Sequence, residues 1–87
     1  MKLTIQNILQ IQGYLRNVAE VDPNDEIANA ASQLAVDLEI VPVPFDYDTL
    51  SEAEKATVQY AIKKRDIYVL RPGARHAVNT MVDNTVN

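Results

Sequence analysis

The sequence predicts a mainly α-helical protein built on a helical hairpin. Apolar residues recur at steps of three and four along two successive segments, residues 4–19 and 23–39. A proline-rich stretch then interrupts this pattern, and helix start signals resume after it. We therefore expect a hairpin, a Pro-rich crossing segment, a third helix and a short C-terminal helix. Two of the segments between helices could also pair as one short two-stranded β element.

The first expected helix covers residues 4–19, with Thr4 as its N-cap. Its core-facing stripe consists of Ile8, Ile11, Leu15 and Val18, widened by Ile5 and Leu9. Gly13 lies inside this helix, where glycine costs about 1 kcal/mol relative to alanine. A glycine at this position also allows a neighbouring element to approach closely.

The second expected helix covers residues 23–39 and begins with strong start signals. Asp22 is placed to cap it, and Pro23 occupies the first helical position. The seam that would face the first helix consists of Ile27, Ala31, Leu34, Leu38 and Val41. Because only a short turn separates the two helices, an antiparallel arrangement is expected.

The crossing segment follows, with Pro42 and Pro44 holding the chain in extended conformations. A third helix then runs to about residue 65. Two capping boxes fit its start, one formed by Thr49 with Glu52 and the other by Ser51 with Glu54.

The third helix is apolar on two sides. One face is formed by Ala53, Ala56, Thr57, Tyr60 and Ala61, and the other side carries Val58 and Ile62. Such a helix is either sandwiched or meets a second molecule, so Val58 and Ile62 form a candidate apolar interface.

The C-terminal part contains two further expected elements. Residues 66–71 are rich in β-favouring side chains and fit either a strand, which would pair with residues 41–43, or a continuing helix. After the turn at Pro72 and Gly73, a short helix is expected over residues 74–82, with Ala74, Val78 and Met81 facing inward. We expect residues 1–87 to form a single small domain.

Composition places the chain among soluble globular proteins. Its 87 residues are 47% hydrophobic and 23% charged. With no cysteine, the chain contains no disulfide, thiol nucleophile or thiolate metal site. Because the N-terminal stretch lacks an unbroken apolar run and no segment approaches membrane-spanning length, we expect a cytoplasmic protein that is not membrane-bound.

The net charge of −4 conceals a division along the chain. Ten acidic residues and no Lys or Arg lie between Glu20 and Glu54. From Lys55 onward, six basic residues stand against two acidic ones. The middle therefore carries −10 and the last third +4, an asymmetry that bears on association.

The basic end supplies candidate contacts for an anion or an acidic partner: Lys63, Lys64, Arg71, Arg75 and His76. Lys63, Lys64 and Arg65 point about 100° apart on a helix, and they also suit an ordinary helix C-terminus. Arg71 and Arg75 flank a turn that is expected to open a helix, which makes them the stronger candidates.

The acidic middle supplies a candidate docking surface formed by Asp25, Glu26, Asp37 and Glu39. Three interpretations remain open: a solvated face, a mimic of nucleic-acid phosphates, and a surface that docks a basic partner or the basic end of another copy. A calcium-binding EF loop starting at Asp46 is excluded, because Ser51 would stand where glycine is needed and Thr57 where glutamate is needed.

The sequence shows few candidate catalytic residues, and neither a cofactor nor a metal is expected. The lone histidine, His76, has no recognisable nucleophile and orienting group beside it in the sequence. We therefore predict a non-catalytic protein-interaction or assembly module that uses its acidic middle and basic end, and whose partner is either further copies of itself, in a homo-oligomer, or another, basic protein. Two alternatives are a small phage-type inhibitor that mimics nucleic acid and a weak nucleic-acid-binding protein using residues 63–76.

Overall fold

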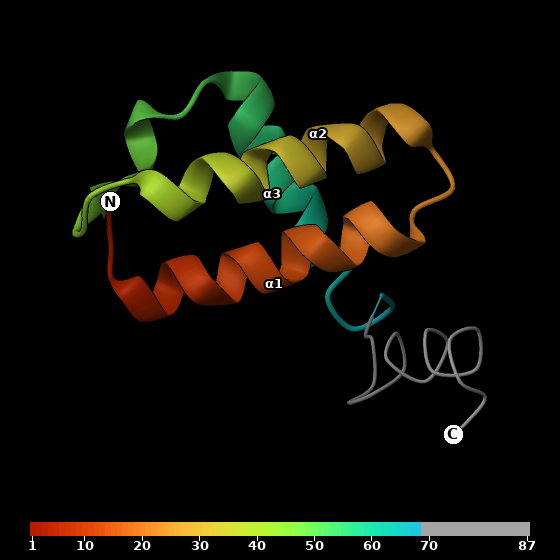
Figure 1. Cartoon of the computed structure of the whole chain (residues 1–87), viewed down its shortest axis with the longest axis horizontal. Helices are drawn as coiled ribbons and strands as arrows, with labels where there is room; N and C mark the ends of the chain where they lie inside the picture. The colour runs from red at the N-terminus through yellow and green to blue at the C-terminus, as the bar shows by residue number, and fades with distance from the viewer. Residues whose placement is uncertain (69–87) are drawn as a thin grey trace.

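The computed structural model describes residues 1–68, and it confirms the mainly helical fold. Two long helices form an antiparallel hairpin, and a third helix crosses behind them (Figure 1). The elements in chain order are β1 (Lys2–Leu3), α1 (Ile5–Val21), α2 (Asp25–Asp37), the 3₁₀ turn η1 (Leu38–Ile40), β2 (Phe45–Asp46), the 3₁₀ turn η2 (Tyr47–Thr49) and α3 (Glu52–Lys63).

Helix α1 begins at the predicted cap. The Thr4 hydroxyl accepts a hydrogen bond from the backbone N–H of Asn7, and the Asn7 side chain accepts one from the Thr4 N–H. Together these bonds satisfy two amides that the first helical turn leaves free.

The core stripe of α1 is narrower than predicted. Ile8, Leu15 and Val18 are buried, but Ile5 and Leu9 are 51% and 54% exposed, so their assignment to the core was wrong. Gln12 lies at the hairpin interface in their place. Its side-chain amide donates a 2.9 Å hydrogen bond to the backbone oxygen of Ala35 in α2, which compensates for burying a polar group.

Helix α2 begins two residues later than predicted, and its cap is Asn24 instead of Asp22. The Asn24 side chain accepts hydrogen bonds from the amides of Glu26 and Ile27. Asp22 instead ends α1 and directs its carboxylate toward α3. Pro23 consequently lies in the turn between the two helices.

The predicted seam of α2 faces the core. Ala31, Leu34 and Leu38 are buried, and Ile27 and Val41 pack against them. The antiparallel hairpin and its seam are therefore confirmed.

A two-stranded element is present, but it pairs different residues from those considered. Lys2 and Leu3 of β1 pair antiparallel with Asp46 and Phe45 of β2. Residues 66–68 form a turn after α3 and do not pair with residues 41–43. The remaining residues of the 66–71 segment and the expected C-terminal helix lie outside the described residues.

Helix α3 uses the second of the two expected capping boxes. The Ser51 hydroxyl accepts from the Glu54 amide at 3.1 Å, and the Glu54 carboxylate accepts from the Ser51 amide at 2.8 Å. Val58 and Ala61 of α3 are each 1% exposed and complete the core against the hairpin. Within residues 1–68, no helix has both the length and the hydropathy needed to cross a membrane.

Candidate functional site: an acid-rimmed groove

A groove runs between α2 and α3. It consists of two neighbouring hollows of about 300 and 160 Å³ that share Ala30 and Thr57 as lining residues. Helix α2 contributes one face to the groove, formed at steps of four, three and four by Glu26, Ala30, Gln33 and Asp37. Helix α3 contributes Ala53, Glu54, Ala56, Thr57 and Tyr60, and Glu54 lines the same hollow as Asp37.

Small side chains produce the groove. Ala30, Ala53 and Ala56 are exposed, and their methyl groups leave the space that larger residues would fill. Ile27 and the buried Leu34 also line the two hollows, so the lining between the acidic ends is mostly apolar. One of the two predicted faces of α3 therefore lines an open groove.

Acidic side chains stand at both ends of this groove. Glu26 lies in the first turn of α2, where a carboxylate complements the helix dipole, and Asp37 is the last residue of the same helix. A carboxylate at that end is unfavourable, and α2 has no basic residue in its last turn. Asp37 accepts a 3.0 Å hydrogen bond from neutral Gln33. None of the ion pairs formed within residues 1–68 involves Glu26 or Asp37.

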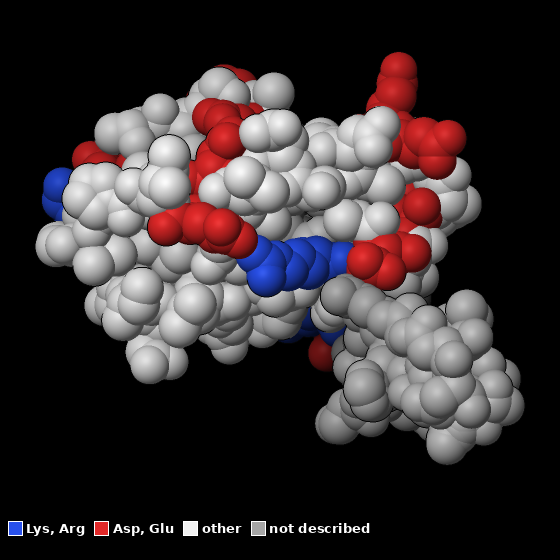
Figure 2. Space-filling view, in the orientation of Figure 1, with Lys and Arg blue, Asp and Glu red and all other residues white. Residues whose placement is uncertain are grey.

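The four acids of the predicted docking surface do not form one patch. Glu26 and Asp37 lie on the groove, but Asp25 is not among its lining residues. Glu39 in η1 forms a 2.5 Å ion pair with Arg16 of α1. Figure 2 shows the hairpin face, where acidic side chains gather at the turn between α1 and α2 and few basic ones appear.

The predicted basic contacts divide between described and undescribed residues. Lys63 is exposed in the last turn of α3, where its positive charge complements the helix dipole. The Lys64 ammonium lies 5.6 Å from the ring centroids of both Tyr60 and Tyr68. Arg65 donates a 2.7 Å hydrogen bond to the Ile62 carbonyl. Arg71, Arg75 and His76 lie outside the described residues.

The predicted apolar interface at Val58 and Ile62 is not an exposed surface. Val58 belongs to the core, and Ile62 packs against it, because this side of α3 faces α1. A larger hollow of about 450 Å³ lies beside them between α1 and α3, with Ile11 and Tyr14 also in its lining. Lys2 and Arg65 line it instead of acidic residues. It therefore does not match the acidic docking surface predicted from the sequence.

A buried polar cluster, which sequence reasoning missed, joins both ends of the hairpin turn to α3. Asp22 is 9% exposed, and its carboxylate accepts hydrogen bonds from the hydroxyls of Tyr60 and Tyr68 and from the Asn24 amide. These bonds, that from Tyr60 foremost, lower the pKa of Asp22. The same carboxylate raises the pKa of Tyr60 above its usual value. The sequence signal was the pair of tyrosines eight residues apart near the end of α3.

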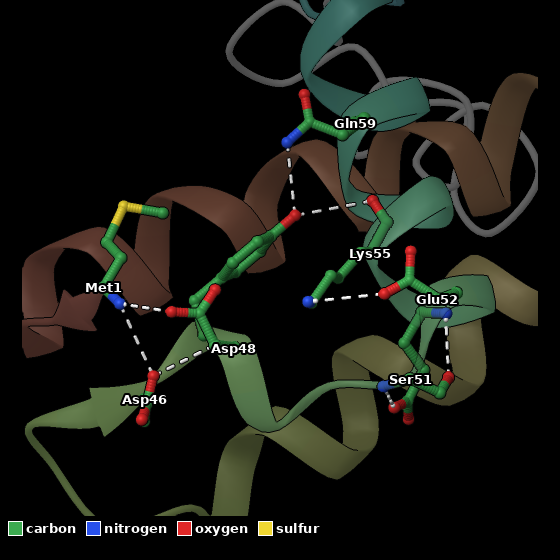
Figure 3. Close-up of polar contacts among 9 residues, drawn as sticks. Met1, Asp46, Asp48, Ser51, Glu52, Lys55 and Gln59 are labelled. Carbon is green, nitrogen blue, oxygen red and sulfur yellow. Dashed lines mark hydrogen bonds and ion pairs between the residues drawn. The ribbon is translucent and has the colours of Figure 1, made fainter.

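Asp46, Asp48 and Glu52 form local contacts around the first residue of the chain and the first turn of α3 (Figure 3). The Met1 ammonium lies 2.7 Å from Asp48 and 3.5 Å from Asp46. Asp46 also accepts a hydrogen bond from the Asp48 amide, which lowers the pKa of the Asp46 carboxyl. Lys55 pairs with Glu52 at 3.5 Å. Across residues 1–68, no three His, Cys, Asp or Glu side chains form a group that could hold a metal ion.

Comparison of the chain with protein-family models, with curated proteins and with solved structures finds no match.

Proposed function

We propose that this protein is a non-catalytic protein-interaction module that binds a basic amphipathic helix in the groove between α2 and α3. One observation carries the proposal: the groove is mostly apolar and has an acidic side chain at each end, Glu26 at one and Asp37 at the other. Neither of these carboxylates forms an ion pair with a cation of residues 1–68. Helix-in-groove recognition combines these features, because the trough buries apolar anchors and the rim selects charge.

The spacing of the acids limits the partner segment. Glu26 and Asp37 are eleven residues apart on one helix, about 16 Å along its axis. A partner helix of about three turns spans that distance. We expect small or aliphatic side chains along its inner face, because the trough is lined by alanines, and a Lys or Arg near each end. A cation beside Asp37 would also offset the unfavourable position of that carboxylate at the end of α2.

The chain itself contains a segment with part of this chemistry, an apolar face with cations at its first end only. The expected helix over residues 74–82 has Ala74, Val78 and Met81 on one side, begins three residues after Arg71 and includes Arg75 in its first turn. Such a segment on a neighbouring copy would enter the groove head to tail and produce a homo-oligomer. A basic segment of another cytoplasmic protein is the other candidate, since the absence of cysteine is consistent with a reducing compartment.

The experiment measures binding of a fluorescein-labelled peptide of residues 69–87 to the full-length protein by fluorescence anisotropy. We expect the double variant Glu26→Gln/Asp37→Asn to weaken binding about tenfold, and binding of the original protein to fall as salt is raised. The matched control is Asp25→Asn/Glu39→Gln, which removes the same charge away from the groove. Equal peptide binding by the two double variants would contradict the proposal that the peptide binds in the groove between α2 and α3.

A second arm separates this proposal from the nucleic-acid alternatives. Mimicry of a phosphate backbone needs a row of closely spaced acids, whereas the four acids of the predicted surface stand at the two ends of α2 and in η1. A mimic would compete with duplex DNA for a basic protein and lose this effect when Asp25, Glu26, Asp37 and Glu39 are all neutralised. Direct binding of DNA by the protein at low salt would instead support the basic segment, residues 63–76.

A further inference from the structure

The hollow between α1 and α3 has the size and the lining of a small-molecule site. Its volume is about 450 Å³, and such sites occupy about 300–1,000 Å³. Leu3, Tyr47 and Val58 of its lining are buried, and Ile11 and Ile62 are half-buried. None of its lining residues lines the groove between α2 and α3, so the two sites are built from different side chains.

Polar side chains of the same hollow retain unused hydrogen-bonding groups. Within residues 1–68, no hydrogen bond involves the side-chain amide of Gln10 or the hydroxyl of half-buried Tyr14. Gln59 donates a 3.2 Å hydrogen bond to the hydroxyl of Tyr47, which leaves the side-chain oxygen of Gln59 available (Figure 3). An apolar lining with a few polar groups that open onto the same space is typical of ligand sites.

Arg65 is the positively charged group of this lining that has no acidic partner within residues 1–68. It donates one 2.7 Å hydrogen bond, to the backbone oxygen of Ile62. Because a guanidinium has five N–H donors, Arg65 retains donors for a ligand. The other positive groups of the lining, Lys2 and the Met1 ammonium, each pair with Asp46, at 3.7 and 3.5 Å.

The charge of the lining favours an anionic ligand. The whole chain carries −4, yet no Asp or Glu is among the residues that line this hollow. A guanidinium binds a carboxylate through two parallel hydrogen bonds, which suits Arg65 to this group. Residues 69–87 of the chain itself are a poorer match, because they carry Arg71 and Arg75 against the single acid Asp83.

We propose that this hollow binds a small aliphatic carboxylate, with its carboxylate on the guanidinium of Arg65 and its hydrocarbon chain along Ile11, Val58 and Ile62. Removal of the hydrocarbon chain from water drives the binding, and the ion pair with Arg65 selects the charged end of the ligand. This function goes beyond the proposed one, because it uses the other side of α3 and a ligand of the opposite charge.

An NMR titration of the isotope-labelled full-length protein with sodium octanoate tests the proposal. We expect saturable shifts of the amide signals of Ile11 and Ile62 and a dissociation constant of about 1 mM or lower. Octanamide has the same hydrocarbon chain without the charge, and we expect it to bind about tenfold more weakly. Equal affinity for the two compounds would overturn the assignment of an anion, and no response to octanoate would overturn the site.

Arg65→Gln is expected to weaken octanoate binding about tenfold and to leave octanamide binding unchanged. The matched control is Lys63→Gln, which removes the same charge from an exposed position of α3 outside the hollow. Arg65→Lys keeps the charge but loses the planar fork, so it should restore only part of the affinity. Equal octanoate affinity of Arg65→Gln and Lys63→Gln would overturn the proposal.

Three further outcomes are informative. Contacts between residues 69–87 and Ile11 or Ile62 in nuclear Overhauser spectra, if octanoate does not displace them, would assign the hollow to the chain's own end and overturn the proposal. Shifts induced by phospholipid vesicles but not by octanoate would assign it to a lipid surface and also overturn it. Glu26→Gln/Asp37→Asn is expected to leave octanoate binding unchanged, so its effect on peptide binding reports separately on the proposed function.

Discussion

The hydroxyl of Tyr68 donates a 3.0 Å hydrogen bond to the carboxylate of Asp22, which lies 46 residues earlier in the chain. Tyr60 donates to the same carboxylate oxygen, and the Lys64 ammonium lies over both tyrosine rings. One side chain in the hairpin turn therefore holds the end of α3 and the turn that follows it.

Replacement of Asp22 by asparagine is expected to destabilise the protein. The variant keeps the shape of the side chain but loses the charge that accepts two tyrosine hydroxyls, and charge-assisted hydrogen bonds are the stronger ones. We expect a lower urea midpoint and faster hydrogen exchange at the amides of Ile67 and Tyr68. Asp25→Asn, an exposed acid of the adjacent first turn of α2, is the control and is expected to leave both measurements nearly unchanged.

Acidification is expected to remove the contribution of Asp22. The folded protein holds the pKa of Asp22 below its ordinary value of about 3.9, so the stabilisation is complete above that value and is lost as the pH falls through the folded-state pKa. Urea midpoints of the original protein and of Asp22→Asn should therefore differ at pH 7 and approach each other as the pH falls through the lowered pKa of Asp22. A constant difference down to pH 2 would show that the asparagine acts through packing instead of charge.

Local patterns explain which parts of the fold were predictable. The capping boxes of Thr4 and Ser51 involve residues three positions apart, and the seams of α1 and α2 follow helical periodicity. The pairing of Leu3 with Phe45 spans 42 residues, and no local pattern indicates it. The burial of Gln12 depends on the angle between the two hairpin helices, and that angle cannot be predicted from helical periodicity alone.

The candidate site was predictable in its charges but not in its shape. The run of acids without a cation indicated Glu26 and Asp37. The groove between these two acids depends on how α2 and α3 pack, so Ala30 and Ala53 did not stand out in the sequence. Val58 was a candidate interface residue, with a sandwiched α3 as the alternative, because the two apolar sides of α3 are equivalent until the position of α1 is known.

Truncation of Val58 is expected to reduce stability and not association. Val58 is 1% exposed, and Val58→Ala removes two methyl groups from the core beside α1, which costs about 2–3 kcal/mol of unfolding free energy. Chemical denaturation measures this loss. Ile67→Ala at a 69% exposed position is the control, with a change within about 0.5 kcal/mol. Weaker self-association of Val58→Ala at unchanged stability would restore the interface interpretation.

The Ser51 cap is expected to contribute measurably to α3, and therefore to one wall of the groove. Ser51→Ala removes the acceptor for the Glu54 amide and should lower the unfolding free energy by about 1 kcal/mol, as other N-cap replacements do. Ser32→Ala, in the exposed interior of α2, is the control. It is expected to be neutral or to stabilise by about 0.5 kcal/mol, since alanine favours a helix interior. Because a serine is lost in both variants, equal effects in urea denaturation would mean that the capping bond contributes nothing. A loss confined to Ser51→Ala, accompanied by faster amide exchange in the first turn of α3, would locate the stabilisation at the cap.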